Sequence, residues 1–142
     1  MPSPPIIPGS HSDTDDWVAI IDDDPSIRRS LTRAFASYDI RVEAFGSAEQ
    51  YLGRASESEP SCLVLDIQLG GLSGFELQNR LQSQSASPPA IIFISAHADM
   101  LKQGARFRRA HGFLQKPFDI DELVGLVRPL LRRVPLSLDG YQ

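Results

Sequence analysis

The stretch CLVLDIQLGGLSG, residues 62–74, places a carboxylate between an apolar run and a glycine-rich turn. Cys62 to Leu65 form a short apolar run of the kind found in buried strands, and Asp66 stands where that strand is expected to end. In an open α/β sheet, ligands bind outside the carboxyl ends of the strands. Asp66 is therefore the first candidate for a functional residue.

Other apolar runs of the chain also end on polar residues. Those residues are Asp22 and Asp23 after the run at 18–21, Ser95 after the run at 91–94, and Lys116 with Pro117 after the run at 112–114. Because the carboxyl ends of parallel strands meet at one edge of a sheet, four strand ends are expected to converge on one polar site.

Short β-branched apolar runs alternate with amphipathic stretches along the chain, which predicts a parallel sheet covered by helices on both faces. We expect five strands and five helices. The strands are predicted at Trp17–Ile21, Ile40–Ala44, Cys62–Leu65, Ala90–Ile94 and Gly112–Leu114.

Several helix ends carry a local signal. The expected N-caps are Asp24, followed by Pro25 at the first helical position, then Ser47 and Ser73. The fourth helix, within 99–110, contains Gly104 and is expected to be short or loose. The fifth should begin near Asp119 and stop near Arg128, since Pro129 cannot donate a backbone hydrogen bond.

Length and composition limit the class of protein. The 142 residues suit one domain, and the net charge of -4 argues against a general nucleic-acid binder. Cys62 is the single cysteine, which fits a reducing cytoplasm, and no apolar run approaches the length of a membrane span. We expect a flexible N-terminal tail over 1–16, a folded domain over 17–134 and a C-terminal tail over 135–142.

Four motifs, taken together, resemble the receiver domain of two-component response regulators. They are IIDDD at 20–24, LVLD at 63–66, FISA at 93–96 and FLQKPF at 113–118, and they stand in the family's order. The resemblance implies a flavodoxin-like doubly wound fold, with a five-stranded parallel sheet of order 2-1-3-4-5 flanked by five helices. It also implies a stand-alone signalling domain that is phosphorylated on an aspartate.

The site chemistry follows in part from the residues themselves. Three crowded carboxylates repel one another unless a cation compensates, and Mg²⁺ or Mn²⁺ suits Asp22, Asp23, Asp66 and a backbone carbonyl. By resemblance that carbonyl belongs to Gln68. Asp66 is then the phosphoacceptor that becomes 4-aspartylphosphate, while Ser95 and Lys116 bind the phosphoryl oxygens.

The resemblance also implies how the signal enters and leaves. The donor is a sensor histidine kinase or a phosphotransfer protein, and Ser95 with Phe113 forms the switch. Output passes to a downstream protein through the face of helix four, strand five and helix five, with a phosphorylation-linked homodimer as a further option. The Lys116–Pro117 bond is cis in the family, and the side chains of Gln68 and His97 flank the attacking water and tune the lifetime.

The chain departs from the family pattern in the turn after Asp66, where Gly70 and Gly71 replace the usual proline. More backbone freedom should hold the Gln68 carbonyl less firmly, so we expect weaker Mg²⁺ affinity. Direct contact with nucleic acid or membrane is not expected, nor is enzymatic activity beyond the domain's own phosphorylation and dephosphorylation.

Two alternatives remain open on the sequence. One is a non-switching receiver that acts as a phosphorylation-independent binding module. The other, less favoured, is an aspartyl-phosphate phosphohydrolase of the haloacid dehalogenase type, which requires a second carboxylate where this chain has Gln68.

Overall fold

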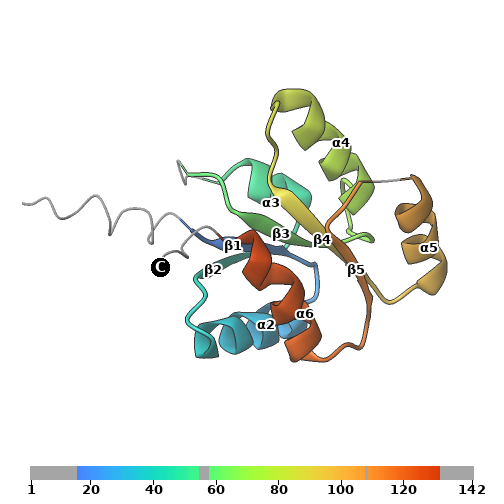
Figure 1. Ribbon diagram of the computed structural model, residues 1–142. Coiled ribbons are helices and arrows are strands. Elements are labelled where there is room, and N and C mark those ends of the chain that lie inside the picture. Colours follow the sequence, from blue (N-terminus) through green and yellow to red (C-terminus); the bar gives the residue numbers. More distant parts are fainter. Residues whose placement is uncertain (1–15, 55–57, 108, 132–142) are drawn as a thin grey trace, which may run out of the picture.

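The computed structural model describes residues 16–54, 58–107 and 109–131. Five parallel strands form a single sheet of order β2-β1-β3-β4-β5 (Figure 1). The strands are β1 (Val18–Ile21), β2 (Val42–Phe45), β3 (Cys62–Asp66), β4 (Ala90–Ser95) and β5 (Gly112–Gln115). The order is the predicted one, and the central strand β3 pairs with β1 on one side and β4 on the other.

Helices cover both faces of the sheet (Figure 1). They are α2 (Pro25–Ser37), α3 (Ala48–Leu52), α4 (Gly74–Gln84), α5 (Ala98–Phe107) and α6 (Ile120–Val127). Alternate residues of the central strands point to opposite faces. Ile21 and Leu65 therefore pack in the core under α3, α4 and α5, whereas Ile20 and Val64 pack under α2 and α6.

The predicted helix starts are confirmed. Asp24 accepts a hydrogen bond from the Ser26 backbone amide at 2.8 Å, and Pro25 takes the first helical position of α2. Ser73 caps α4 and forms a reciprocal pair of hydrogen bonds with Glu76, a capping box. Asp24 follows the end of β1 closely, whereas Ser73 closes the loop after β3, so the two caps fix where the helices begin beside the carboxylate-bearing strand ends.

The second strand begins two residues later than predicted, at Val42 rather than Ile40. The Ile40 amide donates to the Phe35 carbonyl at 3.0 Å, closing the end of α2 instead of joining the sheet. Asp39 beside it adopts a positive φ of 60°, which turns the chain. Ile40 is buried all the same, which is why its apolar character imitates a strand residue.

The fourth helix, α5, runs over ten residues and is longer than the short or loose helix expected. A Cβ atom at Gly104 would lie 2.9 Å from Cε1 of Phe113 and 3.1 Å from Cζ of Phe75. The glycine therefore allows close packing of α5 on the sheet. The last helix behaves as predicted: α6 ends at Val127, and Pro129 falls in the 3₁₀ turn Arg128–Leu130.

The predicted tails lie outside the described residues, except for Asp16. This residue is buried and accepts a hydrogen bond from the Ser61 hydroxyl, so the described fold begins one residue before Trp17. Among the described helices, none has the length and apolar character needed to cross a membrane.

Candidate functional site

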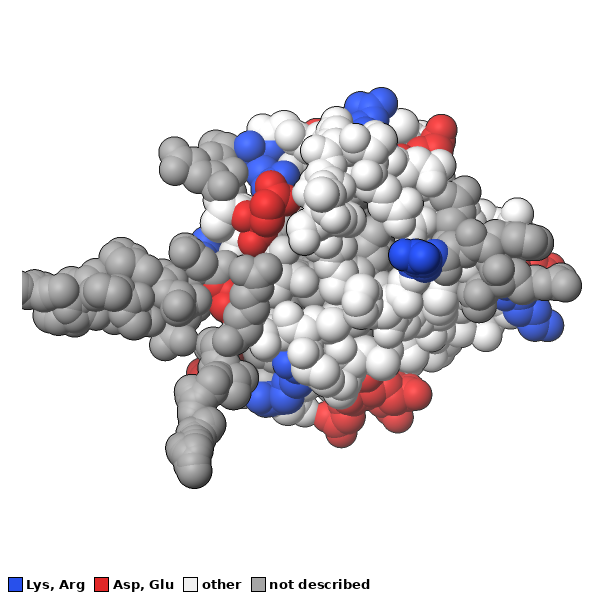
Figure 2. Space-filling view, turned by 45° about the horizontal axis from the view of Figure 1, so that its top comes forward, with Lys and Arg blue, Asp and Glu red and all other residues white. Residues whose placement is uncertain are grey.

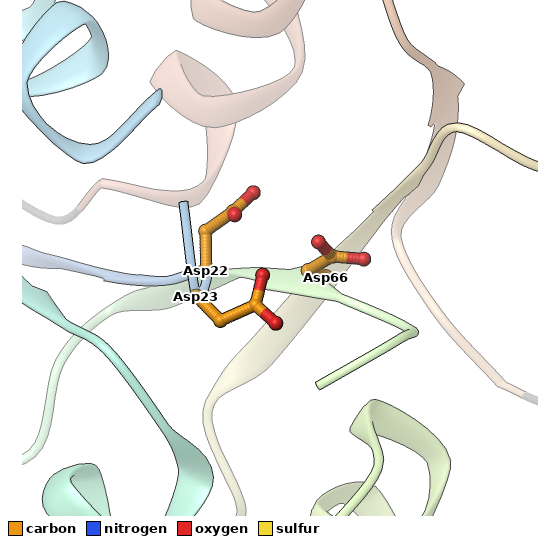
Figure 3. A group of neighbouring side chains, drawn as sticks. All are labelled: Asp22, Asp23 and Asp66. Atoms are coloured by element: carbon orange, nitrogen blue, oxygen red, sulfur yellow. The ribbon is translucent and has the colours of Figure 1, made fainter. Parts of the chain in front are cut away.

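Three carboxylates meet at the carboxyl ends of two neighbouring strands. Asp22 and Asp23 follow β1 and Asp66 ends β3, and Figure 3 shows their side chains converging. One oxygen from each of the three lies within 4.8 Å of the others. Asp22 is fully buried, Asp66 is 5% exposed and Asp23 is exposed, so the cluster is open to solvent on one side.

Lys116 reaches the cluster from the loop after β5. Its Nζ donates to Oδ2 of Asp22 at 2.7 Å and to Oδ2 of Asp66 at 2.9 Å. The lysine side chain is only 18% exposed, so both ion pairs are partly shielded from water. The Lys116–Pro117 peptide bond is cis. The sheet therefore brings together residues that are 94 and 50 positions apart in the chain.

Backbone groups orient the two buried carboxylates. Oδ1 of Asp22 accepts from the Asp24 amide at 2.9 Å, and Oδ1 of Asp66 accepts from the Gln68 amide at 3.0 Å. The guanidinium of Arg28 donates to the backbone oxygen of Asp22 at 2.8 Å. Each carboxylate thus has one oxygen held by a local turn and one held by Lys116.

Burial shifts the titration of these groups. It raises the pKa of Asp66 above its ordinary value; the Lys116 hydrogen bond opposes this shift and the charge of Asp22 adds to it. Burial alone would lower the pKa of Lys116, but its hydrogen bonds to Asp22 and Asp66 and the negative charges of these two carboxylates together outweigh burial and hold that pKa above the ordinary value. The negative charge at this site depends on cationic partners.

Ser95 ends β4 and is fully buried. Its Oγ accepts a hydrogen bond from the His97 amide at 3.0 Å, and its backbone oxygen accepts from the Lys116 amide at 2.8 Å. A hydroxyl can accept this bond and still donate its own proton. Lys116 and Ser95 are therefore tied together at the strand ends, with the serine proton available.

A hollow of about 300 Å³ lies over the cluster. Its lining includes Asp23, Asp66, Gln68, Ala96 and Lys116. The predicted site residues Asp66 and Lys116 thus border one opening, together with Gln68, whose backbone carbonyl is the expected fourth metal ligand. His97 is exposed and lies two residues beyond Ser95.

Phe113 in β5 is half-buried and stacks on Phe93, with ring centroids 5.6 Å apart. Phe93 in turn makes an edge contact with Phe75 at 5.2 Å. The predicted switch aromatic is therefore part of an aromatic cluster between the sheet, α4 and α5. Gly104 forms one wall of this cluster.

Two residues that support the site were not identified from the sequence. A Cβ atom at Gly74 would lie 2.5 Å from the backbone oxygen of Asp66, so the start of α4 approaches the phosphoacceptor candidate closely. Glu49 in α3 accepts a hydrogen bond from the Leu72 amide at 3.0 Å. Both contacts join segments whose proximity only the fold creates. The glycine-rich turn was the one visible signal, and it does not show which glycine is needed.

Comparison with known proteins agrees with this geometry. Nodulation protein W of Bradyrhizobium diazoefficiens is 42% identical over 122 residues, covering 84% of this chain and 53% of that protein. The response regulator protein TodT of Pseudomonas putida is 34% identical over 125 residues, covering 87% of this chain and 55% of its own length. This chain therefore spans about half the length of these curated relatives.

Solved structures of response regulators are also similar to this chain. The response regulator StyR is 36% identical, with a TM-score of 0.71 over 82% of this chain and 59% of the StyR chain. TrrA of Thermotoga maritima, solved with Mg²⁺ and BeF, shares the fold at a TM-score of 0.72 and 23% identity, covering 82% of this chain and 99% of its own. The model of the response regulator receiver domain matches residues 18–128. The chain belongs to the response regulator receiver domain family of two-component systems.

Proposed function

We propose that this receiver domain accepts a phosphoryl group on Asp66 from a histidine kinase or a phosphotransfer protein. The observation that carries the proposal is the Nζ of Lys116 bridging Asp22 and Asp66 within a cluster of three carboxylates. A cation placed between two carboxylates at a strand end can later bind the oxygens of a phosphoryl group held there.

The donor set fits a magnesium ion. Asp22, Asp23 and Asp66 offer hard carboxylate oxygens within 4.8 Å of one another, and one side of the cluster opens to water. We propose these three residues and the Gln68 backbone carbonyl as the ligands of Mg²⁺, or of Mn²⁺ in its place. When bound, the ion supplies positive charge that keeps the carboxylates ionised and offsets charge on the phosphoryl oxygens.

The chain's own residues perform the transfer. A carboxylate oxygen of Asp66 attacks the phosphorus of a phosphohistidine donor; the new O–P bond forms as the P–N bond breaks, and its electron pair leaves with the imidazole. Lys116 donates to one phosphoryl oxygen and the Ser95 hydroxyl donates to another. This stabilises the charge that collects on those oxygens in the transition state.

Through the same contacts, phosphorylation of Asp66 changes the shape of a distant surface. Ser95 is drawn toward the phosphoryl oxygens, and Phe113 moves within its aromatic cluster to the space beside it. The surface of α5, β5 and α6 then presents a different shape to a downstream protein or to a second copy of the chain. Phosphorylation must favour one of the two arrangements for this to work as a population shift.

The partners proposed for this domain are proteins. Basic and acidic side chains are interspersed over the face in Figure 2, and its described residues form no continuous basic surface that would follow a phosphate backbone. One matched relative, NtrC of Salmonella typhimurium, is named a DNA-binding transcriptional regulator, and this chain covers 24% of it. A cytoplasmic location, where such kinases deliver their phosphoryl groups, completes the proposal.

Magnesium dependence tests this proposal through Asp23→Asn. Asp23 is exposed and lies outside the Lys116 ion pairs, so its substitution removes a ligand charge with little effect on folding. The Mg²⁺ concentration that gives half-maximal phosphoryl incorporation from a small phosphodonor should rise by roughly tenfold. Asp99→Asn, in the first turn of α5, makes the same charge change at a residue outside the proposed ligand set and should match wild type. Equal Mg²⁺ dependence in Asp23→Asn and wild type would contradict the metal assignment.

Gln68 and His97 are proposed to set the lifetime of the phosphorylated state. Both residues are exposed, and Gln68 lines the hollow over the cluster. On this proposal their side chains flank a water that attacks the phosphoryl group. Gln68→Ala and His97→Ala should each change the rate at which the phosphoryl group is lost, by roughly tenfold or less. Decay of the phosphorylated mass with time measures this rate. Unchanged decay in both variants would remove the two residues from the mechanism.

A further inference from the structure

Glu49 connects α3 to the loop that follows Asp66. Its Oε2 accepts a hydrogen bond from the backbone amide of Leu72 at 3.0 Å. Leu72 lies in the loop between β3 and α4, four residues after Gln68, and Glu49 comes from the first turn of a different helix. This contact therefore fixes the loop from outside.

The other hydrogen bonds of the loop lie near its two ends, and the side chains of Leu69 and Leu72 pack against the core. At its start, the Gln68 amide donates to Asp66 Oδ1 at 3.0 Å. At its end, the Gly74 amide donates to the Ile67 carbonyl at 2.9 Å, and the Ser73 amide donates to Glu76. Between these anchors stand two glycines with no side chains to pack. The Glu49 contact falls on the residue directly after them.

Gly71 makes room for the Glu49 carboxylate. A Cβ atom at Gly71 would lie 2.4 Å from Oε2 and 2.8 Å from Oε1 of Glu49, whereas a Cβ atom at Gly70 would meet nothing within 4 Å. No glycine in the described part of the chain has a positive φ. The backbone conformation therefore does not require glycine at position 71, but the position of the carboxylate does.

The start of α3, which carries Glu49, is itself anchored by hydrogen bonds. The Ser47 hydroxyl caps α3 through the Gln50 amide, and the side chain of Gln50 accepts from the Gly46 amide at 2.8 Å. The Leu72 amide, assisted by Glu49's own amide and the charge of Arg80, holds the pKa of Glu49 below its ordinary value. Glu49 thus reaches the loop from a well-anchored helix start.

We propose that Glu49 is a positioning residue that holds the loop so that the Gln68 carbonyl faces the metal ligands Asp22, Asp23 and Asp66. The inference rests on the proposed magnesium-dependent function. It assigns to Glu49 the constraint that a proline supplies in the family pattern and that Gly70 and Gly71 do not. The pair Glu49 and Gly71 then acts as a unit, because the glycine is needed only to admit the carboxylate.

The test measures Mg²⁺ affinity of the full chain by amide NMR titration, without phosphodonor, for a set of matched variants. Glu49→Ala removes the acceptor, and Gly71→Ala displaces it with a methyl group. Each should weaken Mg²⁺ binding by roughly three- to tenfold. Mutating a residue that supports a metal ligand costs more affinity at a buried site, and the contact between Glu49 and Leu72 is exposed. Glu49→Gln keeps an acceptor oxygen and should rescue the affinity to within about twofold of wild type.

Two controls separate this role from a structural one. Gly70→Ala adds the same methyl group one residue away without meeting the Glu49 carboxylate, so it should not weaken Mg²⁺ binding. The double variant Glu49→Ala with Gly71→Ala should be no weaker than either single variant, since both remove the same contact. The free energy of unfolding of each variant, measured in urea without Mg²⁺, should not rank the variants in the same order as their Mg²⁺ affinities. A purely structural role for Glu49 would make the two orders agree.

Three outcomes would overturn the inference. They are wild-type affinity in Glu49→Ala, equal losses in Gly70→Ala and Gly71→Ala, or additive losses in the double variant. None of these depends on phosphorylation, so the role of Glu49 can fail while Asp66 still accepts a phosphoryl group. If wild type binds no Mg²⁺ at all, the proposed function fails first.

Discussion

Lys116→Ala is expected to slow phosphoryl incorporation on Asp66 by roughly 100-fold or more, the usual cost of removing one preorganised donor from a charge-stabilising site. The Nζ of Lys116 already contacts Asp22 and Asp66, so in the account above it moves only a short way to bind a phosphoryl oxygen. Its loss also leaves two buried carboxylates without their shared cation. Time courses of intact mass with Mg²⁺ and a small phosphodonor measure the effect.

The matched control is Lys102→Ala, which removes the same charge from the exposed side of α5. Its phosphorylation rate should equal that of wild type within about twofold, because exposed charges contribute little at a distance. If Lys116→Ala were phosphorylated as fast as this control, Lys116 would serve only to neutralise the carboxylates in the resting state.

Gly74→Ala is expected to destabilise the fold by about 2–3 kcal/mol, within the range for inserting a group into a closely packed site. The new Cβ would lie 2.5 Å from the backbone oxygen of Asp66 and 2.9 Å from Cα of Ile67. Both are main-chain atoms at the end of a buried strand, so they cannot move aside as a flexible side chain can. Urea unfolding of the full chain measures the loss.

Gly125→Ala is the matched control for this substitution. It lies in α6, where a Cβ atom would meet nothing within 4 Å, so the change should stabilise the protein by about 0.5–1 kcal/mol through helix propensity. Opposite signs for the two glycines are therefore expected. A Gly74→Ala variant as stable as wild type would show that α4 and the loop after Asp66 adjust freely. The short distance from Gly74 to the Asp66 backbone would then not constrain the fold.

The sequence predicted the fold wherever local signals agree with tertiary structure. Asp24 followed by Pro25 marks the start of α2 because a cap and a first-turn proline act through their own neighbours in the chain. The buried strand ending at Asp66 is equally local, since a parallel sheet covered on both faces needs an uninterrupted apolar run. The strand order came from the family resemblance and not from these local signals.

The predictions for the second strand and the fourth helix were wrong because tertiary contacts override local propensity. Ile40 is apolar and buried, but its amide closes a helix, and only the fold decides which partner that amide takes. Gly104 suggested a weak helix, yet it allows α5 to approach Phe113 closely. Both residues were judged by propensity, which packing overrides.

The candidate site could be predicted for the residues that end strands, since the sheet itself brings Asp22, Asp66 and Lys116 together. The residues that support the loop could not be predicted. Glu49 and Gly71 lie 22 positions apart, and their close approach depends on how α3 docks beside the loop. Nothing in the local sequence distinguishes Gly71, which admits a carboxylate, from Gly70, which contacts nothing.

The most direct test of the account is the intact mass of the full chain after incubation with Mg²⁺ and a small phosphodonor, compared between wild type and Asp66→Asn. The substitution keeps the size of the side chain and removes the nucleophilic carboxylate. Wild type should gain one phosphoryl group, which is lost on standing and absent when Mg²⁺ is chelated, and Asp66→Asn should gain none. A folded wild-type protein that gains no phosphoryl group, or an Asp66→Asn variant that gains it equally, would contradict the assignment of Asp66 as the phosphoacceptor.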